Sequence, residues 1–178
     1  SGDTALVGAY TKNVAGERSG ATYLFERNHG GPNQWGEVKR FEPLDAGPFL
    51  YFGVSIGLSG DTAVIGAYWQ MDLPGRAYIF ERNAGGPGHW GQTAELYDHG
   101  LESFGYCVSI SADTAVVGAY ANSAGGNRSG RAYIYQRDQG GPGLWGEVAT
   151  LAAGDAGPVQ NLGWSVAVGG STALAGAP

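Results

Sequence analysis

The sequence has little of the chemistry that marks several classes of protein. Its 178 residues include a single cysteine, Cys107, so no disulfide can form within the chain. The apolar runs are far shorter than the roughly 20 residues that a membrane-spanning helix needs. Ten Lys and Arg stand against sixteen Asp and Glu, which gives a net charge of −6. Since there is also no basic stripe, the composition argues against nucleic acid as a partner and against a membrane span.

Patterns that carry catalysis or bind metals are scarce as well. The three histidines, His29, His89 and His99, occupy unrelated positions, and none has a His or Cys neighbour at ligand spacing. The serines of the repeated stretch described next lie on a crowded face of small residues. We therefore predict no catalytic residue, no metal site and no cofactor, and a protein that is not an enzyme.

Glycine and repetition are what the sequence has in abundance. The stretch Phe52–Tyr68, FGVSIGLSGDTAVIGAY, returns as Phe104–Tyr120 and Leu162–Pro178, and its second half opens the chain at Ser1–Tyr10. Bulky residues alternate with Gly, Ser, Cys or Ala, which predicts two short strands joined by a tight turn. The small face, with the Gly-Ala pair that ends the second strand, predicts close approach by a neighbouring backbone. Because Cys107 lies on that small face, we expect a buried free thiol.

Two sets of landmarks give the length of the repeat. Asp3, Asp61, Asp113 and Ser171 follow one another at intervals of 58, 52 and 58 residues, and Trp35, Trp90 and Trp145 are spaced by 55. These intervals divide the chain into a first repeat at 1–58, a second at 59–110, a third at 111–168 and the start of a fourth at 169–178.

Each full repeat predicts four short strands, and no stretch shows sustained helical periodicity. The predicted strands lie near 4–9, 21–27, 35–41, 52–58, 62–68, 76–82, 90–96, 104–110, 114–120, 131–137, 145–151, 162–168 and 172–177. Four strands in 52–58 residues, repeated, are typical of propeller blades. We predict an all-β fold of about three tandem, four-stranded antiparallel blades. A propeller needs about four to eight blades to close, so we expect an open array rather than a closed ring within one chain.

The repeated pattern FGxSV…GDTAVVGA…AY.F.R…W resembles the FG-GAP repeat family, whose best-known members form the β-propeller of integrin α subunits. The variant it resembles most is common in secreted and surface proteins, which implies an extracellular or cell-surface location. One departure is that the family's final Pro occurs only at Pro178, while Tyr10, Tyr68 and Tyr120 stand in the other copies. Integrin-type repeats often carry a calcium loop, D-x-D-x-D-G, between the second and third strands. Here that loop holds only Glu17, Asp72 and, in the third repeat, no acid, so we expect no calcium site.

Three recurring tryptophans, Trp35, Trp90 and Trp145, are candidates for a binding site, and two interpretations of them remain. They could form a glycan-stacking platform, because flat apolar faces suit sugar rings. The alternative, which we favour, is that each packs between loop and sheet with its N–H bonded to a turn carbonyl. Asn127, in Asn-Arg-Ser, is a possible N-glycosylation site in a predicted exposed loop.

The remaining repeated residues are interpreted as scaffold. We expect Arg27, Arg82 and Arg137 to form ion pairs with their sequence neighbours Glu26, Glu81 and Gln136, and Asp45 and Asp155 to cap turns. The repeat scaffold itself consists of Phe52, Gly53, Asp61, Gly66, Phe104, Gly105, Asp113, Gly118, Gly163 and Gly176.

Two hypotheses for function follow. In the first, the chain is an extracellular structural or adhesive repeat module that self-associates with further copies into a fibre or ring. In the second, it is a fragment of a six- or seven-bladed propeller that binds a protein or glycan through its loops. We expect the chain to be cut from a longer array, because closure between its ends would leave one strand surplus. Both ends should therefore lie at exposed or intermolecular faces.

Overall fold

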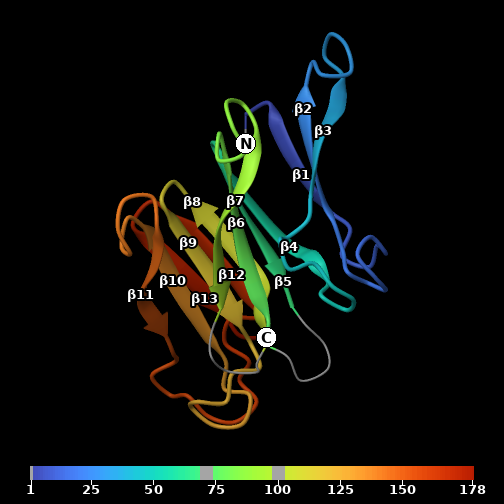
Figure 1. Ribbon diagram of the computed structural model, residues 1–178. Coiled ribbons are helices and arrows are strands. Elements are labelled where there is room, and N and C mark those ends of the chain that lie inside the picture. Colours follow the sequence, from blue (N-terminus) through green and yellow to red (C-terminus); the bar gives the residue numbers. More distant parts are fainter. Residues whose placement is uncertain (1, 69–73, 98–102) are drawn as a thin grey trace.

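The computed structural model describes residues 2–68, 74–97 and 103–178, and these contain thirteen strands and no helix (Figure 1). Each strand lies within three residues of its predicted position. The largest difference is at β12, which begins at Ser165 rather than 162, because its pairing with β13 begins only at Ser165. In β4 and β8, by contrast, Phe52 and Phe104 are already paired with the following strand. Within these residues no helix is long and apolar enough to cross a membrane.

The strands form four antiparallel sheets in chain order, which we call the first to fourth blades. The first blade contains β1 (Thr4–Gly8), β2 (Thr22–Arg27) and β3 (Trp35–Phe41). The second contains β4 (Phe52–Ser59), β5 (Thr62–Ala67), β6 (Arg76–Arg82) and β7 (Trp90–Tyr97). The third contains β8 (Phe104–Ser111), β9 (Thr114–Ala119), β10 (Arg131–Arg137) and β11 (Trp145–Leu151), and the fourth contains β12 (Ser165–Gly169) and β13 (Thr172–Gly176).

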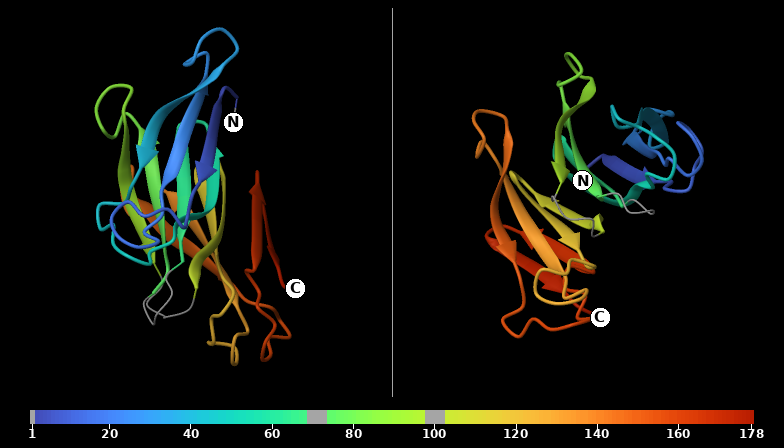
Figure 2. Two further views of the ribbon diagram at one scale, coloured as in Figure 1. Left: turned by 90° about the vertical axis from the view of Figure 1, so that its right-hand side faces the viewer. Right: turned by 60° about the horizontal axis from the view of Figure 1, so that its bottom comes forward.

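The blades stack face to face in a row. Strand β1 packs on β4, β4 on β8 and β8 on β12, so the strand that begins each blade lies next to its counterpart. Figure 2 shows the first and fourth blades at opposite ends of this row, with the other two between them. Among the described residues β1 pairs only with β2 and β13 only with β12. The array is therefore open, as the sequence predicted.

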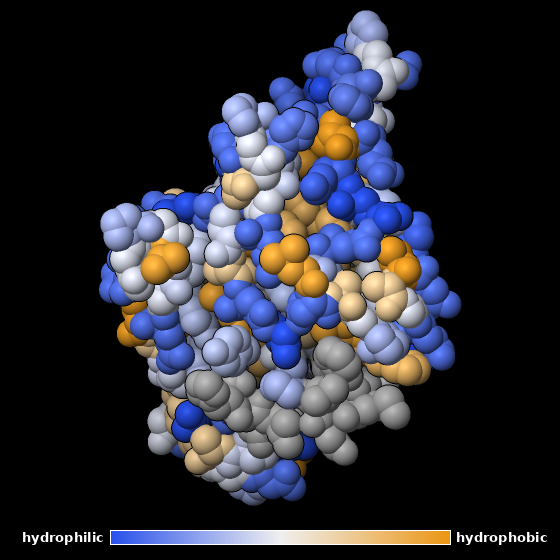
Figure 3. Space-filling view, in the orientation of Figure 1, coloured by the Kyte–Doolittle hydropathy of each residue, from blue (hydrophilic) through white to orange (hydrophobic). Residues whose placement is uncertain are grey.

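The apolar core lies between blades. One cluster joins Leu24 and Phe41 of the first blade to Phe52, Ile65 and other residues of the second. A second cluster joins residues of the second blade, such as Val64 and Ile79, to residues of the third, such as Phe104 and Val117. On the surface in Figure 3 apolar residues are scattered among hydrophilic ones. The hydrophobic effect thus acts mainly to hold each blade to the next.

A β-bulge shapes the strand that begins each complete blade. The pairing of β4 with β5 shifts between Phe52 and Ser55, and that of β8 with β9 shifts between Phe104 and Cys107. The glycine after each Phe has a positive φ of 90° or 82°, a conformation that a residue with a Cβ rarely adopts. The bulge directs Phe52 and Phe104 into the core and turns the backbone of the glycine toward the preceding blade.

Candidate functional site

The contact between successive blades is the feature that the sequence repeats most strictly. A Cβ placed on Gly66, in the Gly-Ala pair that ends β5, would lie 2.0 Å from the carbonyl oxygen of Gly105 in the next blade. The same construction on Gly8 meets Gly53 at 2.1 Å, and on Gly118 it meets Gly163 at 2.1 Å. Only glycine fits at these positions. The predicted close approach is therefore confirmed, and its partner is the Phe-Gly or Leu-Gly pair of the following blade.

The small residues of β4 and β8 make the second part of this contact. The Ser55 hydroxyl donates to the carbonyl of Gly105 at 2.9 Å, and the Val168 N–H donates to Ser109 Oγ at 3.1 Å. Cys107 Sγ accepts the N–H of Val166 at 3.4 Å, and its side chain is partly exposed rather than buried as expected. Ser55 lies in the sequence Gly-Val-Ser-Ile-Gly, which matches the G-x-S-x-G pattern of a nucleophile elbow. That elbow is a strand-to-helix turn, whereas Ser55 lies within a strand and binds the next blade.

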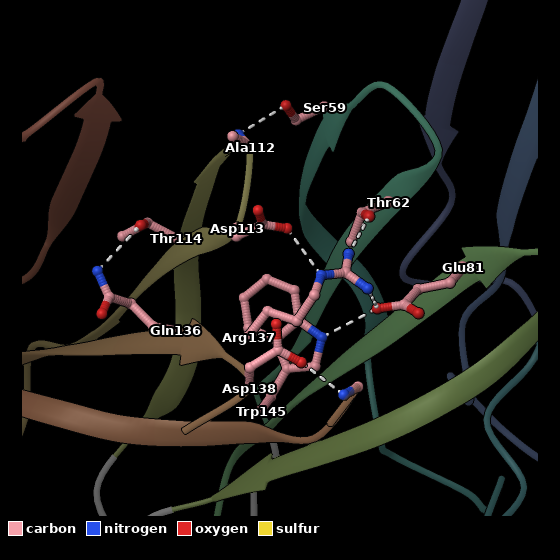
Figure 4. A network of polar contacts seen from close by, with 11 residues as sticks. Ser59, Thr62, Glu81, Ala112, Asp113, Thr114, Gln136, Arg137, Asp138 and Trp145 are labelled. Carbon is pink, nitrogen blue, oxygen red and sulfur yellow. Dashed lines mark hydrogen bonds and ion pairs between the residues drawn. The ribbon is translucent and has the colours of Figure 1, made fainter. Parts of the chain in front are cut away.

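At one end of the blades, an arginine joins the second blade to the first and another joins the third blade to the second. Figure 4 shows Arg137 on β10, whose Nε donates to Asp113 of its own blade at 2.7 Å. Its Nη1 contacts Glu81 of the second blade at 2.7 Å, and its Nη2 donates to Thr62 Oγ1 at 2.8 Å. The guanidinium lies 5.2 Å from the ring centroid of Trp145, whose N–H donates to Glu81 at 3.0 Å. Burial acts to lower the pKa of Arg137, but the bonds to Asp113 and Glu81 raise it overall.

The second blade repeats this arrangement, which we call the arginine clasp. Arg82 binds Asp61 of its own blade and Glu26 of the first blade, both at 2.7 Å, and lies 5.2 Å from the ring of Trp90. The hydrogen bond to Glu26 is the main cause that raises the pKa of Arg82. Trp90 is only 4% exposed and packs edge-on against Phe41 at 5.7 Å. One carboxylate of the first blade, Glu26, and the packing of the Trp90 ring therefore tie these blades together.

The first blade contains half of a clasp. Arg27 binds Asp3 at 2.8 Å and lies 5.1 Å from the ring of Trp35, as in the other blades. The face that Trp90 and Trp145 bury against a preceding blade is open here, and Trp35 is 43% exposed. The glycan-stacking hypothesis for Trp35, Trp90 and Trp145 stays a prediction, and Trp35 is the most exposed of the three rings.

The expected partners of the arginines were wrong in detail. Arg82 and Arg137 pair with an Asp on their own blade and a Glu on the preceding blade, not with the residue beside them in sequence. The indole N–H of Trp145 binds a carboxylate rather than a turn carbonyl, and the buried N–H of Trp90 has no partner among the described residues.

The expected turn caps also differ. Asp45 accepts a hydrogen bond from the Tyr78 hydroxyl at 3.1 Å and pairs with Arg76. Burial, reinforced by the charge of Asp45, raises the pKa of Tyr78 well above its ordinary value. Asp155 contributes a backbone bond, since its carbonyl accepts from Gln160 Nε2 at 3.0 Å.

The other predicted residues take no part in the clasp or lie outside the described residues. Asn127 is exposed in the loop between β9 and β10, and its glycosylation stays a prediction. His29 and His89 line one cleft between the first two blades, a proximity that their sequence positions did not indicate. His99 and Asp72 lie outside the described residues. In the described part of the chain no group of three or more His, Cys, Asp or Glu could hold a metal ion.

Comparison with known families agrees with this architecture. The model of the FG-GAP repeat matches residues 35–80, 90–135 and 145–178, which together exceed half of the chain. The chain therefore belongs to the FG-GAP repeat family. Its repeats form a propeller-like module that is a non-catalytic fold, and they are typical of extracellular and surface proteins. None of the curated proteins compared with the chain matches it.

Proposed function

We propose that the chain is an extracellular structural or adhesive module that associates with further copies of itself through the faces of its blades. The observation that carries this proposal is the half clasp of the first blade. Arg27 and Trp35 occupy the positions at which Arg82 and Trp90 bind a preceding blade, and the corresponding face is open.

The apolar residues on this face of the first blade also fit another blade. Val7 stands at the repeat position of Ile65, and it is 50% exposed where Ile65 is fully buried. Trp35 is 43% exposed where Trp90 is 4% exposed. Because the matching residues of the second blade are covered by a blade, a blade has the shape and polarity that fit the first. Burying these side chains supplies the main driving force for association.

A complementary face lies at the other end of the row. Leu174 on β13 is 64% exposed and Val148 on β11 is 41% exposed. Contact between opposite ends of two copies is heterologous, so repetition gives a ring if the rotation closes and a filament if it does not.

Sedimentation of the 178-residue chain over a range of concentrations tests the proposal. The chain should form assemblies, and Arg27→Glu or Trp35→Ala should shift them toward monomer. Leu44→Ala, at a side chain 88% exposed in a loop of the first blade, serves as the control. A chain that stays monomeric at every concentration contradicts the proposal.

The alternative function is a propeller that binds a protein or glycan through its loops. The observation that favours it is a row of aromatic rings, from Tyr10 to Trp164, at the end of the blades opposite the arginine clasp. Negative-stain microscopy of the native protein separates the two, since fibres or rings of many copies support self-association and single discs support the alternative.

A further inference from the structure

Six aromatic side chains form a continuous row across the blades. In order they are Tyr10, Tyr51, Tyr68, Tyr106, Tyr120 and Trp164, with ring centroids 6.4, 6.0, 5.5, 4.6 and 4.8 Å apart. We call this row the aromatic ladder. Tyr10, Tyr68 and Tyr120 follow β1, β5 and β9, whereas the aspartates of the clasp precede these strands. The ladder therefore lies at the end of the blades opposite the clasp.

The ladder is a property of this chain rather than of the repeat. Tyr10, Tyr68 and Tyr120 stand where the repeat pattern has proline, and Pro178 is the one copy that keeps it. Tyr106 and Trp164 occupy the position that is Val54 in the second blade. These substitutions are scattered along the sequence, yet the fold brings all of their rings into contact.

Both ends of the ladder are accessible. Tyr10 is 47% exposed and Trp164 is 40% exposed, and Tyr68, Tyr106 and Tyr120 are partly exposed between them. Aromatic side chains of this kind combine a flat apolar face with a polar tip, which suits a ligand that is itself amphipathic.

An exposed arginine lies at each end of the ladder. Arg18 Nη1 donates to the Tyr51 hydroxyl at 3.2 Å, and the Arg128 guanidinium lies 5.5 Å from the ring centroid of Tyr120. Both are among only ten Lys and Arg in a chain with a net charge of −6. Their placement on one strip therefore concentrates positive charge on an otherwise acidic protein.

Two loops of the same construction hold these arginines. Arg18 and Arg128 have φ angles of 51° and 54°, which a residue with a side chain rarely adopts. Each arginine precedes a buried serine whose hydroxyl accepts loop N–H groups: Ser19 from Val14 and Ala15, and Ser129 from Gly125. Left-handed backbone at a non-glycine residue is strained, and such residues gather at binding sites.

We propose that the aromatic ladder binds an acidic oligosaccharide, with sugar rings against the exposed aromatic faces and carboxylates at Arg18 and Arg128. Guanidinium groups bind carboxylates in two-pronged hydrogen bonds, and tyrosine hydroxyls match the hydroxyls of a sugar. A peptide is the weaker fit, because extended peptides add to the edge of a sheet and the ladder crosses the ends of strands. This site is independent of the clasp and of self-association.

The test is isothermal titration of the 178-residue chain with an oligogalacturonate, a neutral malto-oligosaccharide and a poly-glutamate peptide. Binding of the oligogalacturonate alone, weakened by added salt, is the expected result. Trp164→Ala and Arg128→Gln should each weaken it about tenfold, the effect of losing one ring contact or one charged bond. Trp164→Phe, which keeps an aromatic face, should retain most of the affinity and guards against a variant that fails to fold.

Controls separate this site from the rest of the molecule. Leu144→Ala removes an exposed apolar side chain from the turn between β10 and β11, and Arg40→Gln removes an exposed arginine elsewhere; both should bind as the unaltered chain does. Equal binding of the neutral sugar, binding of poly-glutamate in place of the sugar, or no binding at all would each overturn the proposal. Ladder variants should leave sedimentation unchanged, so either proposal can fail without the other.

Discussion

Replacing Gly66 by alanine tests whether the close approach of neighbouring backbones holds the blades together. The added Cβ would lie 2.0 Å from Gly105 O and 2.2 Å from Ser55 Oγ, where real contacts stay above 3.0 Å. The Gly105 oxygen belongs to the backbone of the next blade, so relief requires β8 to move by about 1 Å. Overpacking of a well-packed interior costs about 1–3 kcal/mol, and we expect the upper end because the obstacle is backbone.

At about 2–4 °C per kcal/mol for a chain of this size, Gly66→Ala should lower the melting temperature by roughly 6–12 °C. Thermal unfolding followed by circular dichroism measures this shift. Gly169→Ala is the matched control, because Gly169 lies in β12 and no atom comes within 4 Å of its added Cβ. Equal melting temperatures for the two variants would refute the idea that this contact is tight.

Three further predictions concern the tryptophans, one tyrosine and metal ions. Trp90→Ala should cost about 3–5 kcal/mol in denaturant unfolding, as for other buried aromatic residues, while Trp35→Ala should cost less than about 1 kcal/mol in dilute monomer. Burial and Asp45 raise the pKa of Tyr78, so the unfolded chain loses this proton first and stability should fall as pH rises above about 10. Tyr78→Phe should flatten that part of the pH profile in thermal melts. A chelator should leave the melting temperature unchanged, because we expect no bound metal ion. A metal ion bound only to the folded state would stabilise it, so its removal would lower the melting temperature.

The strands could be predicted because each repeat supports the assignment of the others. Phe52–Ser59 alone is a short apolar run, but its recurrence at Phe104–Ser111 with the same turn after it fixes both ends. The start of β12 was misplaced because Leu162 and Gly163 match the sequence pattern, whereas the pairing with β13 begins only at Ser165. Phe52 and Phe104 each pair with the alanine that ends the following strand, and the sequence pattern does not show that Leu162 lacks such a pair.

The clasp partners were missed although alternation in a strand contains the signal. Glu81 and Arg82 are successive residues of β6, so their side chains point to opposite faces and cannot pair. Glu81 faces the third blade and binds Arg137, while Arg82 faces the first. The aromatic ladder was harder to predict, because its rings come from loops and strand ends of four blades. Its one signal was the replacement of proline by tyrosine, which the sequence displays but does not explain.

The two exceptions to the clasp pattern fall at one interface. Gln136 replaces the Glu that would accept an arginine from a following blade, and Ser171 replaces the Asp that would hold that arginine within its own blade. Both carboxylates are thus lost from the same set of contacts. An arginine clasp between the third blade and the blade that follows it would therefore rest on neutral acceptors, which bind a guanidinium less strongly than carboxylates do.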